Sequence, residues 1–407
     1  MSCDLTDNPL RARCAVSLSS PGPVTVALEA PGVPPRSFHS PDRVLRHDIL
    51  AWGLVPETPY TWSVGARQGT ITTGALPADL ARASVITTGT AWGFDAVLYP
   101  LACEPTSYFT LIDGQGRIVW FEPNDVFFDQ TMTGYEWSQG SLSVLSLRST
   151  RFLEQHVSGQ ILLDLRGGVE LEHKLHHDAD RWGRHRYLLH EYPLGDGRNV
   201  DGIDVFDDDQ LVGTFDLADA FEIVGGGPGD WSHANGLNVT DSGEIILSLL
   251  NFDTILGIDG DPASPTFLQL SWHAVGSGDG LPEPDYVPVA GVGQGFSGQH
   301  NASRHGDELW VFDNTGDGAR SRALRMQMDH VAGTLEAVDW WWFDHQCSNQ
   351  GGALPIEGGV LATCANRNDV WAFRDGERRP DWTLKAGCDG GGISGLDITR
   401  AIPVFIE

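Results

Sequence analysis

Lysine is almost absent from this chain, and basic side chains as a whole are scarce. The sequence has two lysines, Lys174 and Lys385, and only 26 Lys and Arg residues against 55 Asp and Glu residues. Its formal net charge is −29 over 407 residues. A surface of this charge repels the phosphates of nucleic acids and of anionic membranes, so we expect no nucleic-acid partner.

Long apolar runs are also missing. No stretch approaches the roughly 18 residues that a membrane-spanning helix needs, so the sequence predicts no transmembrane segment. Hydrophobic residues still make up 41% of the chain, enough for a substantial core. A cysteine at position 3 of a Ser- and Asp-rich start is typical of a lipoprotein whose signal has been removed. We therefore expect an exported protein, periplasmic or at the cell surface, with a leader over residues 1–10 and Cys3 as the lipid anchor of the full-length precursor.

Recognised catalytic and metal motifs are lacking as well. The six cysteines, at positions 3, 14, 103, 347, 364 and 388, show no CxxC spacing. Their even number is compatible with disulfides in an exported protein and equally with free buried thiols. No Gly-x-Ser-x-Gly, P-loop or His-Glu-x-x-His motif occurs. Asp201, Asp204 and residues 207–209 do not follow the EF-hand pattern, so we interpret them as a solvated acidic loop.

Short alternating runs at the start of the chain predict a small domain. Residues 11–76 alternate apolar and polar side chains in short segments separated by Pro and Gly, which is typical of an antiparallel β-sandwich. The segment around Tyr60 resembles the corner of a fibronectin type III module, in which a tyrosine hydroxyl bonds back to the preceding turn. Residues 76–82 are the expected linker.

The rest of the chain repeats a β pattern. Groups of strands recur every ~45 to 55 residues, which predicts a β-propeller. The expected outer strands lie at residues 116–121, 168–172, 213–215, 267–272, 335–340 and 380–384. Six of them predict a six-bladed propeller over residues 83–407, closed by a last strand at 398–406 that pairs with the first blade. Helical periodicity is weak, with at most a turn or two at 217–221. The predicted fold class is all-β, a six-bladed propeller after a small fibronectin-III-like sandwich.

Three histidines stand at matching places in these repeats. His177, His233 and His300 are each followed about ten residues later by a short apolar strand. A fourth copy carries Asn349 and Gln350 in their place. Equivalent positions on successive blades face one central channel, so we expect the three imidazoles to converge on a single site.

The order and spacing of these motifs resemble those of the bacterial arylsulfate sulfotransferases. The residues that carry the resemblance are Leu175-His176-His177-Asp178, Asp230-Trp231-Ser232-His233-Ala234-Asn235, Gln299-His300-Asn301-Ala302, Phe312-Asp313-Asn314 with Ser321-Arg322-Ala323-Leu324, and Asn349-Gln350-Gly351 before Leu354-Pro355. The resemblance implies an exported six-bladed propeller behind a small sandwich. It also implies transfer of a sulfuryl group between phenols through a sulfated histidine, with no nucleotide donor or other cofactor.

The same resemblance implies the roles of individual residues. His300 corresponds to the nucleophile, and His177 and His233 correspond to residues that bind and stabilise the sulfuryl group during its transfer. This suits imidazole chemistry, since a neutral ring is a nucleophile near pH 7 and a protonated one can donate to a leaving phenolate. We expect further contacts to a small aromatic substrate from Trp231, Asn251, Asn349, Gln350 and Arg322.

One departure from the family keeps other functions open. The family places an arginine soon after its Trp-x-His motif, where this chain reads Ser248-Leu249-Leu250-Asn251. Arg322 is a candidate substitute, although its counterpart ties a blade turn together. Three imidazoles around an axis also suit a divalent metal, so a metal-dependent lyase, hydrolase or oxygenase using His177, His233 and His300 is an alternative. A non-catalytic binding protein is another.

Overall fold

The computed structural model describes residues 1–124, 132–138, 140–146, 150–223, 229–276, 280–291, 293–388 and 399–406. Regular structure in these ranges is almost entirely β, as expected. The exceptions are one turn of α-helix, α1 (Leu217–Ala220), and three 3-10 turns, η1 (Leu80–Arg82), η2 (Leu250–Phe252) and η3 (Ala365–Arg367). No helix within the described ranges has the length and apolar character to cross a membrane.

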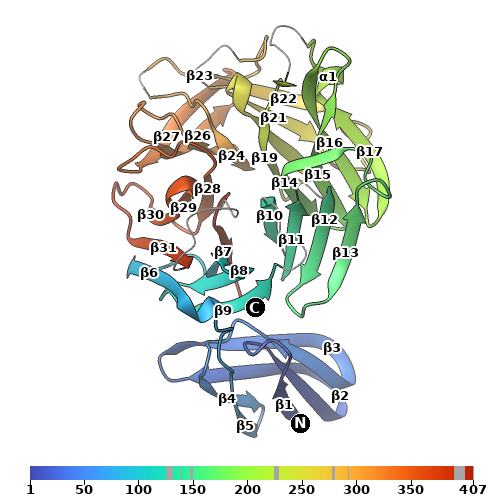
Figure 1. Ribbon diagram of the computed structural model, residues 1–407, viewed down its shortest axis with the longest axis vertical. Helices are drawn as coiled ribbons and strands as arrows, with labels where there is room; N and C mark the ends of the chain where they lie inside the picture. The colour runs from blue at the N-terminus through green and yellow to red at the C-terminus, as the bar shows by residue number, and fades with distance from the viewer. Residues whose placement is uncertain are drawn as a thin grey trace.

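The N-terminal part is a five-stranded antiparallel sheet built on a long hairpin (Figure 1). Its strands are β1 (Ser2–Leu5), β2 (Ala12–Ala30), β3 (Val33–Ala51), β4 (Pro59–Val64) and β5 (Arg67–Thr72). Strand β3 pairs along β2, while β1 and β4 pair with different parts of β2. The classification of this unit as a fibronectin-like sandwich stays a prediction. The tyrosine corner is present, because the buried Tyr60 hydroxyl accepts the N–H of Val55 at 2.9 Å.

The expected leader is instead part of this sheet. Strand β1 lies within residues 1–10, and Cys3 pairs in register with Cys14, to which it is disulfide-bonded. The sulfur of Cys3 is therefore engaged in a disulfide in this structure, and the lipid anchor at Cys3 stays a prediction. Two further disulfides join Cys103 to Cys388 and Cys347 to Cys364, so the described chain holds no free thiol.

Six antiparallel sheets surround a central axis and form the six-bladed propeller (Figure 1). From the axis outward, the first blade is β32 (Ile402–Val404), β7 (Ala96–Cys103), β8 (Thr106–Asp113) and β9 (Ile118–Pro123), and the second is β10 (Met132–Ser138), β11 (Ser141–Ser146), β12 (Arg151–His156) and β13 (Ile161–Arg166). The third is β14 (Lys174–Trp182), β15 (His185–Pro193), β16 (Arg198–Asp207) and β17 (Gln210–Asp216), with β18 (Gly229–Asp230) beside β16. The fourth is β19 (Ala234–Val239), β20 (Glu244–Leu249), β21 (Thr254–Asp259) and β22 (Leu270–Val275). The fifth is β24 (His300–His305), β25 (Glu308–Asp313), β26 (Arg322–Asp329) and β27 (Thr334–Trp342), with β23 (Val287–Pro288) at its edge. The sixth is β28 (Gly352–Ile356), β29 (Gly359–Cys364), β30 (Asp369–Arg374) and β31 (Trp382–Cys388), with β6 (Ala83–Gly89) outside it.

Both ends of the propeller sequence help to close the ring. The C-terminal strand β32 pairs with β7 and completes the first blade from the inside, as predicted for the last strand. The closing strand was expected over residues 398–406, of which residue 398 lies outside the described residues. Strand β6 pairs with β31 and extends the sixth blade from the outside. This pairing covers the outer edge of β31, which would otherwise invite pairing with another chain. The Cys103–Cys388 disulfide also joins the first blade to the sixth.

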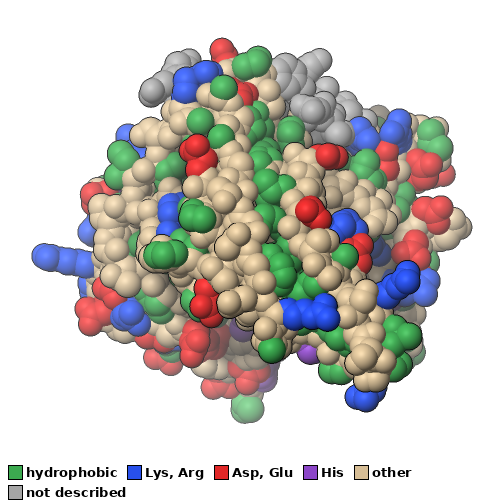
Figure 2. All heavy atoms as spheres, turned by 90° about the horizontal axis from the view of Figure 1, so that it is seen from below, with side chains coloured by type: hydrophobic (Ala, Val, Ile, Leu, Met, Phe, Trp, Pro, Cys, Tyr) green, Lys and Arg blue, Asp and Glu red, His purple; other side chains and the backbone are tan. Residues whose placement is uncertain are grey.

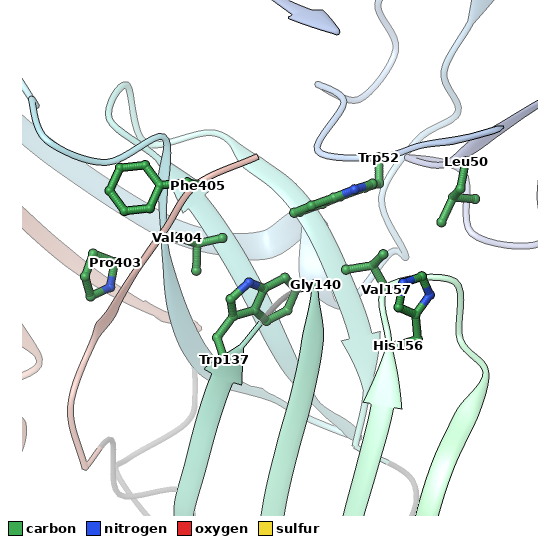
Figure 3. A pocket seen from close by; sticks show the side chains of 9 residues that line it. All are labelled: Leu50, Trp52, Trp137, Gly140, His156, Val157, Pro403, Val404 and Phe405. Carbon is green, nitrogen blue, oxygen red and sulfur yellow. The ribbon is translucent and has the colours of Figure 1, made fainter. Parts of the chain in front are cut away.

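The N-terminal sheet and the propeller share one hydrophobic core. Trp52 and Leu54 belong to the same buried cluster as Val157 and Ile406. A cavity of about 580 Å³ lies at this junction, where Trp52 faces Trp137 of β10 with ring centroids 5.8 Å apart (Figure 3). Seen from the N-terminal end, acidic and basic side chains are interspersed, with a narrow band of hydrophobic side chains between them (Figure 2).

Candidate active site

The inner strands of three blades are irregular where the repeated histidines lie. The pairing register shifts between Leu175 and Ala179 in β14, between Ala234 and Gly236 in β19, and between His300 and Ser303 in β24. Such bulges redirect side chains at the end of a strand. His177 and His233 themselves have positive φ angles of 54° and 50°. The sequence repeat therefore corresponds to a recurrent bulge at one end of the inner strands.

His300 is a neutral imidazole held in one tautomer. The side-chain NH₂ of Asn314 donates to the carbonyl oxygens of Cys347 (2.9 Å) and Gln350 (2.7 Å), so its Oδ1 must face the ring. Nδ1 of His300 donates to that oxygen at 2.9 Å. Nε2 then carries the lone pair and accepts the backbone N–H of Gln350 at 3.2 Å. Burial lowers the pKa of His300 to about 4, so the ring is unprotonated at neutral pH.

His233 has the opposite electrostatic setting. Its Nδ1 lies 2.6 Å from Oδ2 of Asp230, and its backbone N–H donates to the other carboxylate oxygen at 2.9 Å. The hydrogen bond to Asp230 raises the pKa of His233 and outweighs the opposing effect of partial burial. Asn251, on η2, donates to the carbonyls of Asp230 and Trp231 and so holds this loop. His233 can carry a proton where His300 cannot.

His177 lies beside both of these rings and beside its own neighbour. The ring centroids of His177 and His233 are 5.1 Å apart. Nδ1 of His177 lies 2.6 Å from Nδ1 of His176, whose Nε2 is 2.9 Å from Oδ1 of Asp201. Burial, followed by the charges of His176, His233 and His300, places the pKa of His177 well below its usual value. The four imidazoles thus form one electrostatically connected group.

An arginine that the sequence did not single out lies at the axis directly behind these residues. Arg400 is buried; its Nη1 donates to Asp178 Oδ2 (2.6 Å) and Asn301 Oδ1 (2.5 Å), and its Nη2 to Glu136 Oε2 (2.7 Å). Burial opposes its charge, but the carboxylates of Asp178 and Glu136 outweigh this and raise its pKa. The signal available in the sequence was its place two residues before the closing inner strand β32.

The residues expected to contact substrate lie in different places in the structure. Gln350 lies at the site, where its backbone N–H meets His300 and its buried Oε1 has no hydrogen-bond partner in the described residues. Asn251 holds the loop that carries His233, and the buried ring of Trp231 packs on Phe252. Asn349 is exposed and accepts a hydrogen bond from Ser348.

Arg322 does not fit the expected role in substrate binding. Its Nε donates to Asp313 at 2.8 Å, and its two other nitrogens donate to the carbonyls of Gly293 and Gly295. The side chain is buried, and each of its three nitrogens donates to a protein oxygen. Arg322 ties the start of β26 to the loop before β24 instead of facing a ligand.

The predicted solvated acidic loop is also wrong for two of its members. Asp201 and Asp204 lie on β16, and both are buried. Asp201 accepts hydrogen bonds from Ser232 and from the backbone of Ala234, each at 2.6 Å. A carboxylate without such partners would not stay in the interior, so these residues have structural or functional roles.

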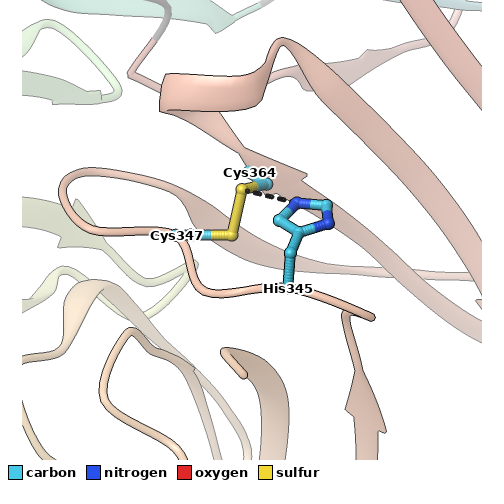
Figure 4. Close-up of side chains that lie close together, drawn as sticks. All are labelled: His345, Cys347 and Cys364. Atoms are coloured by element: carbon cyan, nitrogen blue, oxygen red, sulfur yellow. Dashed lines mark hydrogen bonds between the residues drawn. A yellow bond between two sulfur atoms is a disulfide. The ribbon is translucent and has the colours of Figure 1, made fainter. Parts of the chain in front are cut away.

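Two groups of side chains in the described ranges have the spacing of metal ligands. One contains His345 with Cys347 and Cys364, but these two sulfurs are bonded to each other and His345 Nε2 lies 3.3 Å from Cys364 Sγ (Figure 4). A disulfide does not ligate zinc as thiolates do. The other contains His173, His190 and Asp204. Within the described residues, the ring nitrogens of His177, His233 and His300 do not have the spacing of metal ligands.

Comparison with known proteins identifies one family. The family model described as Arylsulfotransferase (ASST) matches residues 88–336, more than half of the chain. No curated protein matches. Among solved structures, a streptogramin B lyase is 10% identical over 78% of this chain and 91% of its own, with a TM-score of 0.41. A catalytically inactive virginiamycin B lyase from Staphylococcus aureus with quinupristin is 11% identical over 66% of this chain and 73% of its own, with a TM-score of 0.38.

Proposed function

Because the chain belongs to the arylsulfotransferase family, we propose that it transfers a sulfuryl group between phenolic compounds, with His300 as nucleophile and His233 as proton donor. The observation that carries this proposal is the pair of opposite pKa shifts, lowered to about 4 at His300 and raised at His233. Two titratable groups whose environments push their pKa values apart can divide nucleophilic and acid work between them.

The first half-reaction uses the fixed tautomer of His300. Its Nε2 lone pair attacks the sulfur of an aryl sulfate, and the bond from sulfur to the phenolic oxygen breaks. The leaving oxygen takes the proton of the His233 imidazolium and departs as a neutral phenol. The sulfated ring keeps its Nδ1–H bonded to Asn314, so it carries a positive charge that makes it a good leaving group in turn.

The second half-reaction reverses these steps with another phenol. Neutral His233 takes the proton of the acceptor hydroxyl, and the acceptor oxygen attacks the sulfur. The N–S bond breaks and its electron pair returns to Nε2 of His300. The N–H of Gln350, which meets Nε2 in the resting site, is placed to donate to a sulfuryl oxygen during the transfer.

Arg400 acts through other residues. Its guanidinium donates to Asp178 and Asn301, which directly follow His177 and His300 in the chain. We therefore assign Arg400 a positioning role at the axis, and its positive charge compensates carboxylates that would otherwise oppose an anionic substrate.

Export is part of the same proposal. Six cysteines form three disulfides, which persist in oxidising compartments and are rare in the cytosol. A periplasmic or cell-surface location fits both this pairing and the family.

Incubation with a chromogenic aryl sulfate and an acceptor phenol tests the reaction. We expect transfer by the native protein and, without acceptor, a protein mass increased by one SO₃ group. His300→Ala should abolish both signals, while His305→Ala, at the opposite end of β24, should preserve them. Transfer by His300→Ala would refute the nucleophile. Bound metal that is lost in each of His177→Ala, His233→Ala and His300→Ala would favour the metal-dependent alternative. A ligand bound without turnover would favour a binding protein.

A further inference from the structure

A second histidine cluster lies in the third blade, outside the group around His300. His190 is on β15 and Asp204 on β16, and His173 immediately precedes β14. Their ligand atoms all lie within 4.8 Å of one another. The sulfuryl-transfer steps use none of the three.

The distances within this cluster match those between ligands of one small cation. Nδ1 of His173 lies 3.1 Å and Nδ1 of His190 lies 3.4 Å from the same oxygen, Oδ2 of Asp204. Two ligands on a tetrahedral zinc ion, each about 2.1 Å from the metal, are separated by about 3.4 Å. The two imidazole rings stack with centroids 4.1 Å apart, and the Nδ1 atom of each lies on the side of Asp204.

The side chain of His190 is fully buried, and its ring nitrogens meet carboxylates only at ion-pair distances. Neither nitrogen makes a hydrogen bond of normal geometry in the described residues. Buried polar atoms are normally satisfied. Nδ1 points toward Asp204, and Nε2 lies 3.7 Å from Oδ1 of Asp216. That second carboxylate favours the hydrogen on Nε2 and leaves the Nδ1 lone pair for a ligand bond.

The orientation of Asp204 is already fixed. Its Oδ1 accepts the hydroxyl of Thr214 at 2.8 Å, and this contact leaves Oδ2 toward the two imidazoles. Asp204 is buried, whereas the side chain of His173 is 29% exposed. The cluster is therefore rigid on its inner side and reachable from solvent on its outer side.

We propose that His173, His190 and Asp204 bind one divalent first-row transition-metal ion, with Zn²⁺ as the best fit. Two imidazole nitrogens and one carboxylate oxygen are ligands typical of zinc, whereas Ca²⁺ and Mg²⁺ prefer oxygen alone. A fourth position remains on the exposed side for water. The ion would fasten the start of β14 to β15 and β16, and so support the strand that carries His177.

Zinc binding to tag-free protein tests the proposal. We expect chelator-treated protein to take up one Zn²⁺ in a calorimetric titration and to melt at a higher temperature with Zn²⁺. His173→Ala, at the partly exposed ligand, should weaken binding by about 10- to 100-fold and remove the shift in melting temperature. His185→Ala, in the same blade but outside the cluster, is the matched control and should bind as the native protein does.

Three outcomes would overturn the site. They are no Zn²⁺ uptake by the native protein, equal affinity in His173→Ala, or loss of binding in His177→Ala with retention in His173→Ala. The last would place the ion in the channel. If His190→Ala fails to fold, the His173→Ala comparison still decides. A Co²⁺ visible spectrum typical of tetrahedral nitrogen and oxygen ligands, lost in His173→Ala, is an independent positive readout.

Discussion

The Nδ1 atoms of His176 and His177 lie 2.6 Å apart, so the two neighbouring imidazoles share one hydrogen between them. Asp201, 2.9 Å from Nε2 of His176, favours a hydrogen on that nitrogen. Where His177 donates from Nδ1, its Nε2 is an acceptor. Where His176 donates instead, His177 carries its hydrogen on Nε2 and can donate it to a sulfuryl oxygen. An anion in the site therefore favours the arrangement in which His176 is the donor.

This coupling predicts that His176 and His177 act as one unit. His177→Ala should lower the turnover number by about 10²-fold, as loss of one donor to transition-state charge does. His176→Ala should lower it by a similar factor, because it removes the hydrogen-bond partner that determines which nitrogen of His177 carries the hydrogen. The double variant should be little worse than either single one, measured as a double-mutant cycle on steady-state rates. Losses that multiply would show that the two rings act independently.

The opposite pKa shifts of His233 and His300 predict a bell-shaped pH profile. Transfer needs neutral His300, so the rate should fall in acid as pH drops through the lowered pKa of about 4. It also needs protonated His233, so the rate should fall as pH rises through the raised pKa of that ring.

Asp230→Asn separates the two limbs of this profile. Loss of the carboxylate removes the main cause of the raised pKa of His233, so the alkaline limb should move to lower pH while the acid limb stays in place. Rates with a saturating aryl sulfate over a pH series measure this. His305→Ala should keep the native profile, and an unmoved alkaline limb in Asp230→Asn would assign that limb to another group.

The propeller was predictable because each copy of the sequence repeat folds into the same local structure, one blade. Bulged inner strands at His177, His233 and His300 recur with the spacing of the blades. One expected outer strand, residues 168–172, is wrong. There the N–H groups of Val169, Glu170 and Leu171 all turn back to the carbonyl of Arg166, and β13 (Ile161–Arg166) is the outer strand.

The partners that tune the histidines were not predictable in the same way. Asn314 contacts the ring of His300, and Asp201 contacts the ring of His176. In both pairs the two residues lie on different segments of the chain, and only the folded blades bring them together. Arg400 reaches Asp178 across 222 positions of sequence. Hydrophobic periodicity specifies which face of a strand is buried, but it does not specify which buried polar groups meet.

The Cys347–Cys364 disulfide should matter for activity as well as stability. The carbonyl of Cys347 accepts from the Asn314 amide that fixes the tautomer of His300, and Gln350, whose N–H meets His300, follows three residues later. Cys347→Ser with Cys364→Ser should lower stability by about 2 to 5 kcal/mol and also lower the turnover number. Cys3→Ser with Cys14→Ser is the control, since this pair lies in the N-terminal sheet. It should lose stability but keep the native rate at a temperature where both variants are folded, and equal rate losses would contradict the role of the loop.

The junction between the N-terminal sheet and the propeller should depend on Arg11. This buried side chain donates to the carbonyl of Val157 at 2.5 Å and pairs with Glu122 at 2.7 Å, so it links the sheet to two blades. Arg11→Ala removes the cation that compensates the partly buried carboxylate of Glu122 and should lower the free energy of unfolding by about 3 to 5 kcal/mol. Arg13, two residues on, pairs with Asp48 with both side chains more than half exposed, and Arg13→Ala should cost no more than about 1 kcal/mol. Denaturant unfolding of the two variants measures the difference, and equal losses would mean that the junction does not rely on this ion pair.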